Sequence, residues 1–320
     1  MMTFDQVKNI TVLGAGTMGP GIALSFAMGG YDVTIWTRRE EKLEQARVTL
    51  RKGVETFVEQ GLLPAAKLEE CYARVHYELT LEKAVENADF IMETIVEKAD
   101  AKKALFEQLA DCMPEECIVA SNTSGLNVFE LAPQKVLDRM VIAHWYAPPQ
   151  LIPLVEVVKS ESAPEEYAAI TVAMLEKCGK TPVLMKKFIR GYIANRMQMC
   201  LNQEVFYLLD NGYCTPEDID RAVKASFIPR AVVLGLCKRM DFGGLDMTAN
   251  NFRNKSYTMP PEVDMPATLA QHVDNGELGI KSGKGFYDYS DIDMQELLVK
   301  RDKQLYEVFK LARKFLDDPV

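Results

Sequence analysis

The sequence has little histidine, and its cysteines follow no pattern that is typical of a metal site. Only three His residues occur among 320, and the seven Cys residues include no C-x-x-C pair. An odd number of scattered cysteines also argues against a disulfide framework. A chain of this length buries about three quarters of its unfolded surface, so it can fold without either device. We therefore expect no bound metal, and reduced thiols, which are typical of the cytoplasm.

Long apolar runs and an excess of basic residues are absent as well. No stretch approaches the ~20 apolar residues of a membrane-spanning helix, and the first residues, Met1–Asp5, do not resemble a signal peptide. Lys and Arg number 37 against 46 Asp and Glu, which gives a net charge of −9. Nucleic-acid binders need a basic face, so that class is disfavoured. We expect a cytoplasmic protein with a small-molecule substrate and neither a membrane nor a nucleic-acid partner.

The first half of the chain alternates short apolar segments with helical patterns. Such alternation implies parallel crossovers, and hence a Rossmann-type, doubly wound α/β sheet. From Gly191 onward the pattern is helical only. We predict an α/β domain over 1–187 and an all-α domain over 188–320. The expected strands are 9–13, 32–36, 90–94, 118–121, 141–144, 154–158 and 181–185, and the expected helices include 18–28, 40–60, 64–73, 98–110, 164–178, 192–209, 216–225 and 295–315.

A glycine-rich loop follows the first expected strand. Gly14–Gly19 fits the pattern G-x-G-x-x-G between a strand and a helix, which is the context that a dinucleotide-binding loop requires. Gly14 permits the tight turn, Gly16 lets the backbone approach a pyrophosphate, and Gly19 lets the helix pack on the strand. Free N–H groups at the helix start then hold the phosphate charge. The expected cofactor contacts in this loop are Gly14, Gly16, Thr17, Met18 and Gly19.

The end of the second expected strand bears on the choice of dinucleotide. NAD sites usually place an acidic residue here for the ribose hydroxyls, but this chain has Thr37-Arg38-Arg39, with no acid before Glu40. Thr37 can hydrogen-bond a hydroxyl, and Arg38 and Arg39 could clamp a 2′-phosphate. The two arginines could equally be solvated residues at a helix start. We expect NAD or NADP, with the choice open.

A His and a Glu lie in consecutive expected strands. His144 closes one strand, and Glu156 lies in the next, twelve residues later. Adjacent strands could bring the two side chains together. A carboxylate fixes the tautomer of a paired imidazole and stabilises the imidazolium, which favours a general base. A lone His at a strand end is more often structural, but ligands bind at the carboxyl ends of a doubly wound sheet, which favours a functional role here.

Together these segments resemble the 3-hydroxyacyl-CoA dehydrogenase family, in particular its short-chain, 3-hydroxybutyryl-CoA dehydrogenase-like members. The resemblance runs from Asn9 to about Tyr289. It implies an oxidoreductase of fatty acid metabolism, a dinucleotide domain that takes NAD by default, and a helical domain that pairs two chains into a homodimer. The motifs that carry it are the Gly14–Gly19 loop, Ser121–Ser124, His144 with Glu156, Gly191–Arg196 and Ser282–Tyr289.

The resemblance also implies roles for single residues, some of which have plainer interpretations. Ser124 could simply cap a turn, and Lys102 could be a helix-surface charge. Asn195 shares one helix face with Gln198 and Asn202, a stripe that could line a cleft or be solvated. The implied roles are His144 as general base, Glu156 as its partner, Ser124 and Asn195 as hydrogen-bond donors to the substrate oxygen or nicotinamide, and Glu97 and Lys102 as lining of the cofactor site.

Three departures from the family bear on the substrate. The family frequently has an Asn three residues after the His, and this chain has Ala147 there. The acidic residue that is usual at the end of the second strand is replaced by Thr37. Glu55 and Glu59 would repel a CoA phosphate if they face the site. Relatives that act on free hydroxy acids, such as carnitine and gulonate dehydrogenases, share a run like Pro148–Glu156. We expect interconversion of an L-3-hydroxyacyl-CoA and its 3-oxoacyl-CoA; the alternatives are a free short 3-hydroxy acid as substrate, or a non-catalytic dinucleotide-binding protein.

Overall fold

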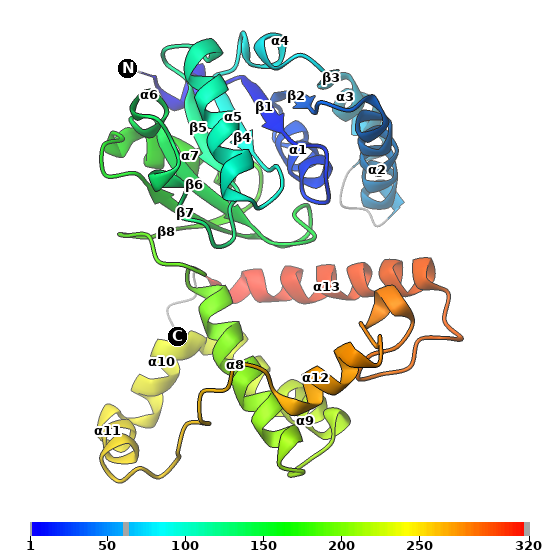
Figure 1. Ribbon diagram of the computed structural model, residues 1–320, viewed down its shortest axis with the longest axis vertical. Helices are drawn as coiled ribbons and strands as arrows, with labels where there is room; N and C mark the ends of the chain where they lie inside the picture. Colours follow the sequence, from blue (N-terminus) through cyan, green and yellow to red (C-terminus); the bar gives the residue numbers. More distant parts are fainter. Residues whose placement is uncertain (1, 60–63, 317–320) are drawn as a thin grey trace. The chain divides into compact units, whose positions relative to one another are not determined.

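A single eight-stranded sheet organises the N-terminal part of the chain in the computed structural model, which describes residues 2–59 and 64–316 (Figure 1). The strand order is β3-β2-β1-β4-β5-β6-β7-β8. Neighbouring strands are parallel except β6 and β7, which are antiparallel. The order reverses between β1 and β4, the switch point at which such sheets bind ligands. The strands are β1 Asn9–Leu13, β2 Asp32–Trp36, β3 Val75–Glu78, β4 Phe90–Glu93, β5 Ile118–Ser121, β6 Met140–Trp145, β7 Leu154–Lys159 and β8 Thr181–Leu184.

Apolar side chains alternate between the two faces of the sheet, and helices cover both. On β1, Ile10 and Val12 belong to one buried cluster, with side chains of α1, α2 and α7, whereas Leu13 belongs to a second, with side chains of α4, α5 and α6. Two covered faces confirm the predicted doubly wound α/β sheet. The helices are α1 Gly19–Met28, α2 Glu40–Glu59, α3 Leu68–Ala73, α4 Leu81–Val85, α5 Ala99–Cys112, α6 Gln134–Leu137 and α7 Glu165–Lys177, with 3-10 turns at Phe4–Gln6, Ala65–Lys67 and Val128–Glu130.

Three elements of this sheet unit, namely β3, α4 and α6, were not predicted from the sequence. Strand β3 lies at the edge of the sheet and buries only Val75 among its four residues, so it has no apolar run to mark it. Helices α4 and α6 are only five and four residues long, which is too short for a helical period to stand out. The last residue of the expected helix 40–60 lies outside the described residues.

The chain divides between Ile193 and Ala194 into two units, a few residues after the predicted boundary. The second unit is helical, as predicted. Thr215 starts α9 with a capping box, in which Asp218 N–H donates to Thr215 Oγ1 at 3.3 Å. No residue described between 194 and 316 is buried. The helices are α8 Ala194–Asp210, α9 Pro216–Ala222, α10 Ile228–Gly243, α11 Leu245–Arg253, α12 Ala267–Asp274 and α13 Met294–Leu316, with a π-helical turn at Val223–Phe227 and a 3-10 turn at Ile280–Ser282.

Candidate active site

The glycine loop closes on itself between β1 and α1. Gly14 has φ +126°, and a Cβ there would lie 2.6 Å from the carbonyl oxygen of Thr94. A Cβ on Gly19 would lie 1.9 Å from the carbonyl oxygen of Gly14, so this glycine allows the loop to close as well as the helix to start. A Cβ on Gly16, in contrast, would meet no atom within 4 Å. The protein itself therefore does not require a glycine at this position, which leaves space beside the loop for a ligand.

The start of α1 is free of side-chain caps. Met18 is the N-cap residue and makes no side-chain capping bond, and Pro20 occupies the first turn. Thr17 is exposed and Met18 half-buried. A helix start without an internal cap is suited to an anion. These features fit the pyrophosphate of a dinucleotide.

The residues after β2 lie at the surface. Thr37 is half-buried, and Arg38 is exposed. Arg39 Nη1 lies 3.2 Å from Glu41 Oε1, in an ion pair whose side chains are both more than half exposed. Arg39 is therefore engaged with a neighbouring acid, as a solvated helix-start residue would be.

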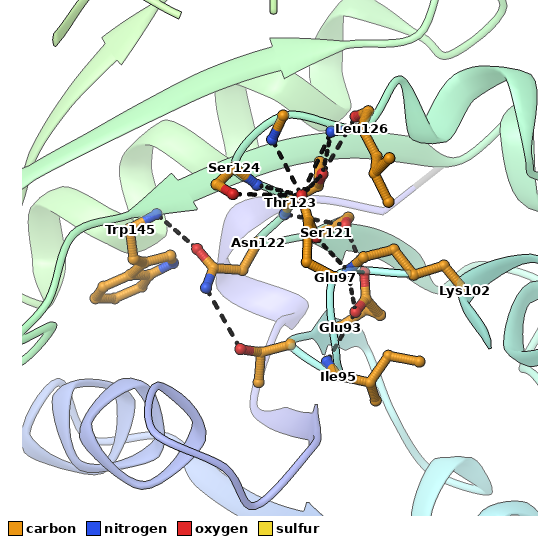
Figure 2. Close-up of polar contacts among 12 residues, drawn as sticks. Glu93, Ile95, Glu97, Lys102, Ser121, Asn122, Thr123, Ser124, Leu126 and Trp145 are labelled. Carbon is orange, nitrogen blue, oxygen red and sulfur yellow. Dashed lines mark hydrogen bonds and ion pairs between the residues drawn. The ribbon is translucent and has the colours of Figure 1, made fainter. Parts of the chain in front are cut away.

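A buried charged cluster joins β4, β5 and α5 (Figure 2). Lys102 Nζ donates to both carboxylate oxygens of Glu93, at 2.6 and 2.8 Å, and the two side chains are 1% and 0% exposed. Ser121 Oγ and Ile95 N–H also donate to Glu93, at 2.5 and 2.8 Å. Lys102 is therefore not a helix-surface charge. The alternative interpretation from the sequence is wrong because β4 and β5 end beside α5 and enclose the amine.

Glu97 organises the loop that follows β5. Its Oε1 accepts hydrogen bonds from Thr123 Oγ1 at 2.6 Å and from the N–H groups of Ser124 and Gly125 at 2.8 and 3.0 Å (Figure 2). Its Oε2 lies 3.3 Å from Lys102 Nζ. Burial alone would raise the pKa of Glu97, but the Thr123 hydrogen bond, the Lys102 charge and the backbone donors together lower that pKa to about 2. Glu97 is therefore a fixed anion that shapes the Ser124 loop.

Asn122 connects three strand ends at the switch point. Its Oδ1 accepts a hydrogen bond from Trp145 N–H at 2.8 Å, and its Nδ2 donates to Thr94 Oγ1 at 3.3 Å (Figure 2). Because Thr94 follows β4 and Trp145 ends β6, the side chain holds both neighbours of β5. This contact fixes the strand end that carries His144.

His144 and Glu156 lie directly opposite each other on β6 and β7. His144 Nδ1 is 3.0 Å from Glu156 Oε2, and the residues are 3% and 0% exposed. Opposed residues of an antiparallel pair have close side chains, so the sheet register alone brings this pair together. Glu156 Oε1 also accepts a hydrogen bond from Ile193 N–H at 2.9 Å.

Two tyrosine rings enclose the imidazole. Tyr192 stacks on His144 with ring centroids 4.5 Å apart and an interplanar angle of 26°. Tyr146 approaches edge-on at 4.6 Å, and its hydroxyl donates to Glu156 Oε2 at 2.7 Å. Tyr192 is fully buried, and its hydroxyl donates to the carbonyl oxygen of Thr123 at 2.7 Å. Burial raises the pKa of Tyr192, and the nearby carboxylates of Glu97 and Glu156 raise it further, so its hydroxyl stays protonated.

The other residues expected from the sequence lie as follows. Ser124 is exposed, and its N–H donates to Glu97. Asn195 is the second residue of α8 in the second unit, where Gln198 Nε2 donates to Asn202 Oδ1 at 2.9 Å. Glu55 and Glu59 are exposed on α2.

Several residues of the site were not predicted from the sequence. Four residues that contact the predicted site residues had no predicted role. They are Glu93, which binds Lys102; Thr123, which binds Glu97; Tyr146, which binds Glu156; and Tyr192, which stacks on His144. Glu93 carried a detectable signal, since it is the only charged residue of the otherwise apolar β4. Tyr192 lies within the Gly191–Arg196 motif, but nothing in its neighbourhood of the sequence connects it with His144.

The described residues hold neither a cluster of metal-ligating side chains nor a membrane-spanning helix. Over 2–59 and 64–316, no group of three or more His, Cys, Asp or Glu side chains is placed to hold a metal ion. No helix within these ranges is both long and apolar enough to cross a membrane.

Comparison with known proteins gives matches along almost the whole chain. Residues 9–188 match the NAD-binding domain of 3-hydroxyacyl-CoA dehydrogenase, and residues 191–289 match the C-terminal domain of that enzyme. A probable 3-hydroxybutyryl-CoA dehydrogenase of Bacillus subtilis is 33% identical over 89% of this chain and 99% of its own length.

Two further matches concern an enzyme whose name contains no CoA. The 5-formyl-3-hydroxy-2-methylpyridine 4-carboxylate 5-dehydrogenase of Mesorhizobium japonicum is 29% identical over 96% of this chain and 98% of its own length. A crystal structure of an enzyme of that name, described as an NAD+-dependent dismutase, superposes with a TM-score of 0.84 at 28% identity, covering 96% of this chain and 99% of the other. This chain belongs to the 3-hydroxyacyl-CoA dehydrogenase family of NAD-dependent oxidoreductases.

Proposed function

We propose that the chain interconverts a 3-hydroxy and a 3-oxo compound, with His144 as the general base. The observation that carries the proposal is the 3.0 Å contact between His144 Nδ1 and Glu156 Oε2 in a buried, register-fixed pair. A pair so placed at the carboxyl end of β6 has the arrangement of a base and its orienting anion. Bound NAD supplies the hydride acceptor.

The proton path follows from this pair. An Nδ1–H that donates to Glu156 leaves the imidazole lone pair on Nε2, which is the atom that takes the substrate hydroxyl proton. Glu156 then balances the imidazolium charge. Burial of both side chains keeps water away from the pair and strengthens this balance. Roles for Ser124 and Asn195 at the substrate oxygen remain predictions from the resemblance, and an alanine substitution at each tests them.

Replacing His144 tests the base directly. His144→Ala should leave NAD affinity nearly unchanged and lower turnover about 10²–10⁴-fold, the usual cost of losing a general base. His76→Ala is the matched control, because His76 is exposed on the edge strand β3. Calorimetry with NAD and initial rates with the best substrate measure the two quantities. A His144→Ala variant that keeps turnover within a few-fold of wild type would show that the base is misassigned.

We propose an L-3-hydroxyacyl-CoA as the first candidate substrate, in line with the relative from Bacillus subtilis. A free hydroxy acid is the second candidate. The end-to-end similarity to a pyridine carboxylate dehydrogenase supports it, as do Ala147 and the exposed acids Glu55 and Glu59. A panel of acyl-CoAs and free hydroxy acids, assayed with NAD and NADP at low salt, distinguishes them. Activity confined to free acids would replace the first candidate by the second.

For the cofactor we propose NAD, with Thr37 serving the ribose and Arg38 solvated. Engagement of Arg39 with Glu41 supports this choice, since a paired guanidinium is less available to a 2′-phosphate. Tighter binding of NADP than of NAD in calorimetry would contradict the choice.

We also propose that the helical unit pairs two chains into a homodimer. Its described residues include no buried side chain, and Phe252, Tyr257 and Met259 are 82%, 83% and 76% exposed. Apolar surface of this extent commonly marks an interface, and identical chains most often pair by two-fold symmetry. Light scattering at micromolar concentration should give the mass of a dimer; a monomer mass would refute the proposal.

A further inference from the structure

We propose that Tyr146 is a positioning residue that sets how strongly Glu156 draws a proton onto His144. The inference rests on the proposed function, because it gives Tyr146 a role through the proposed base. It concerns one oxygen atom. Glu156 Oε2 accepts a hydrogen bond from the Tyr146 hydroxyl at 2.7 Å, and it contacts His144 Nδ1 at 3.0 Å.

The backbone explains why this contact forms. Tyr146 lies two residues after His144, the spacing at which side chains of an extended chain point to the same face. Glu156 stands opposite His144 on the neighbouring strand, so both aromatic residues reach the same carboxylate. The Tyr146 ring lies edge-on to the imidazole at 63°, which places the hydroxyl beside the His–Glu contact without covering the ring face.

The Tyr146 hydroxyl weakens the attraction of the Glu156 carboxylate for a proton on the imidazole. Glu156 is fully buried, and its ionised form needs donors to replace lost water. Ile193 N–H supplies one at Oε1, and Tyr146 supplies one at Oε2. Both donors hold Glu156 ionised while offsetting part of the charge that would otherwise attract a second proton to the imidazole.

Loss of the Tyr146 hydroxyl therefore shifts the balance toward imidazolium. Without the Tyr146 donor, Oε2 of Glu156 carries more negative charge. That charge stabilises the doubly protonated form of His144 more strongly. An imidazolium cannot accept the substrate proton, so the enzyme needs a higher pH to act in the oxidative direction. Tyr146 thus limits how strongly Glu156 attracts a second proton to the imidazole.

Other groups around the imidazole allow a matched control. Tyr192 stacks on the imidazole ring, but its hydroxyl donates to the Thr123 carbonyl. Farther away, the charges of Glu93 and Glu97 also act on Tyr192, and Lys102 pairs with both of those carboxylates. Removing either tyrosine hydroxyl leaves these three charges in place.

The experiment compares Tyr146→Phe with Tyr192→Phe in the full chain. Two readouts are taken over the same pH range: kcat/KM in the oxidative direction, and NMR titration of the His144 imidazole, assigned by its loss in His144→Ala. In Tyr146→Phe the acid limb of the kcat/KM profile and the His144 titration midpoint should both move upward by about 0.5–1 pH unit. In Tyr192→Phe neither should move.

Each outcome decides the proposal. Unmoved midpoints in Tyr146→Phe would overturn it, and so would equal shifts in both variants, because equal shifts would report lost packing rather than one hydrogen bond. If Tyr146→Phe does not fold, fluorotyrosine at position 146 replaces it; its stronger donor should move the midpoint downward, and no movement refutes the proposal. If the wild type turns over no substrate, the proposed function fails, while the NMR titration still decides the role of Tyr146.

Discussion

Replacing Lys102 with Met should destabilise the sheet unit by about 3–5 kcal/mol, the usual cost of breaking a buried ion pair by removing one partner. The amine lies within 2.8 Å of both oxygens of Glu93 and 3.3 Å from Glu97 Oε2. Methionine fills a similar volume but donates nothing. Glu93, with 0% exposure, would keep only Ser121 Oγ and Ile95 N–H as described donors for a full negative charge.

The two tryptophans of the chain make this cost measurable. Trp36 and Trp145 both lie in the sheet unit, on β2 and β6, so their fluorescence during urea unfolding follows this unit alone. Lys103→Met is the matched control, because Lys103 is the neighbouring residue and is exposed. Loss of its amine should change the free energy of unfolding by less than about 0.5 kcal/mol. Adding Glu93→Gln to Lys102→Met should recover most of the loss, because the charge that remains without its lysine is then Glu97, which is partly exposed and keeps the Thr123, Ser124 and Gly125 donors. If Lys102→Met is no less stable than Lys103→Met, the buried pair does not stabilise the fold.

Three further predictions concern the cofactor loop, the carboxylate partner of the proposed base, and the partly exposed acid Glu97. Gly16→Val should abolish NAD binding in calorimetry without lowering the urea midpoint, because a side chain there meets no protein atom within 4 Å; retained tight binding would place the cofactor elsewhere. Glu156→Gln should lower turnover and move the acid limb of the rate profile to lower pH, since the imidazolium loses its anion, and an unchanged rate and profile would make Glu156 merely structural. Glu97, with a pKa lowered to about 2, stabilises the fold fully above about pH 4.5 and loses that contribution as pH falls toward 2. Because its side chain is 36% exposed and screened by solvent, we expect the Glu97 charge to contribute about 1 kcal/mol to the free energy of unfolding. The difference in that free energy between wild type and Glu97→Gln should therefore narrow below pH 4.5. A difference that does not depend on pH would contradict the ionised state.

The sequence was sufficient wherever a pattern is local. Strands β1 and β2 were predicted with their observed bounds, because each is a short apolar run between clear turn signals. The closed loop at Gly14–Gly19 was equally local. The partnership of His144 with Glu156 needed one further assumption, that their strands are neighbours. The antiparallel register of β6 and β7 met that assumption.

What the sequence could not give depends on contacts between distant segments. Lys102 looks like an ordinary helix-surface lysine, since only the packing of α5 beside the ends of β4 and β5 buries its amine. Tyr192 reaches Thr123 across 69 positions, a separation over which no periodicity applies. Side-chain placement of this kind is set by tertiary packing, which overrides local propensity.

The segment between β8 and α8 has a consequence for dissecting the protein into fragments. Tyr192 supplies the ring stacked on His144, and Ile193 supplies an N–H donor to Glu156, although both follow the last strand of the sheet. An expression fragment that stops at residue 187 would strip the imidazole of one wall and the carboxylate of one donor. A fragment that extends through residue 193 retains both. The natural place to cut this chain is therefore after the strand-to-helix connection, where the first residue of α8 begins.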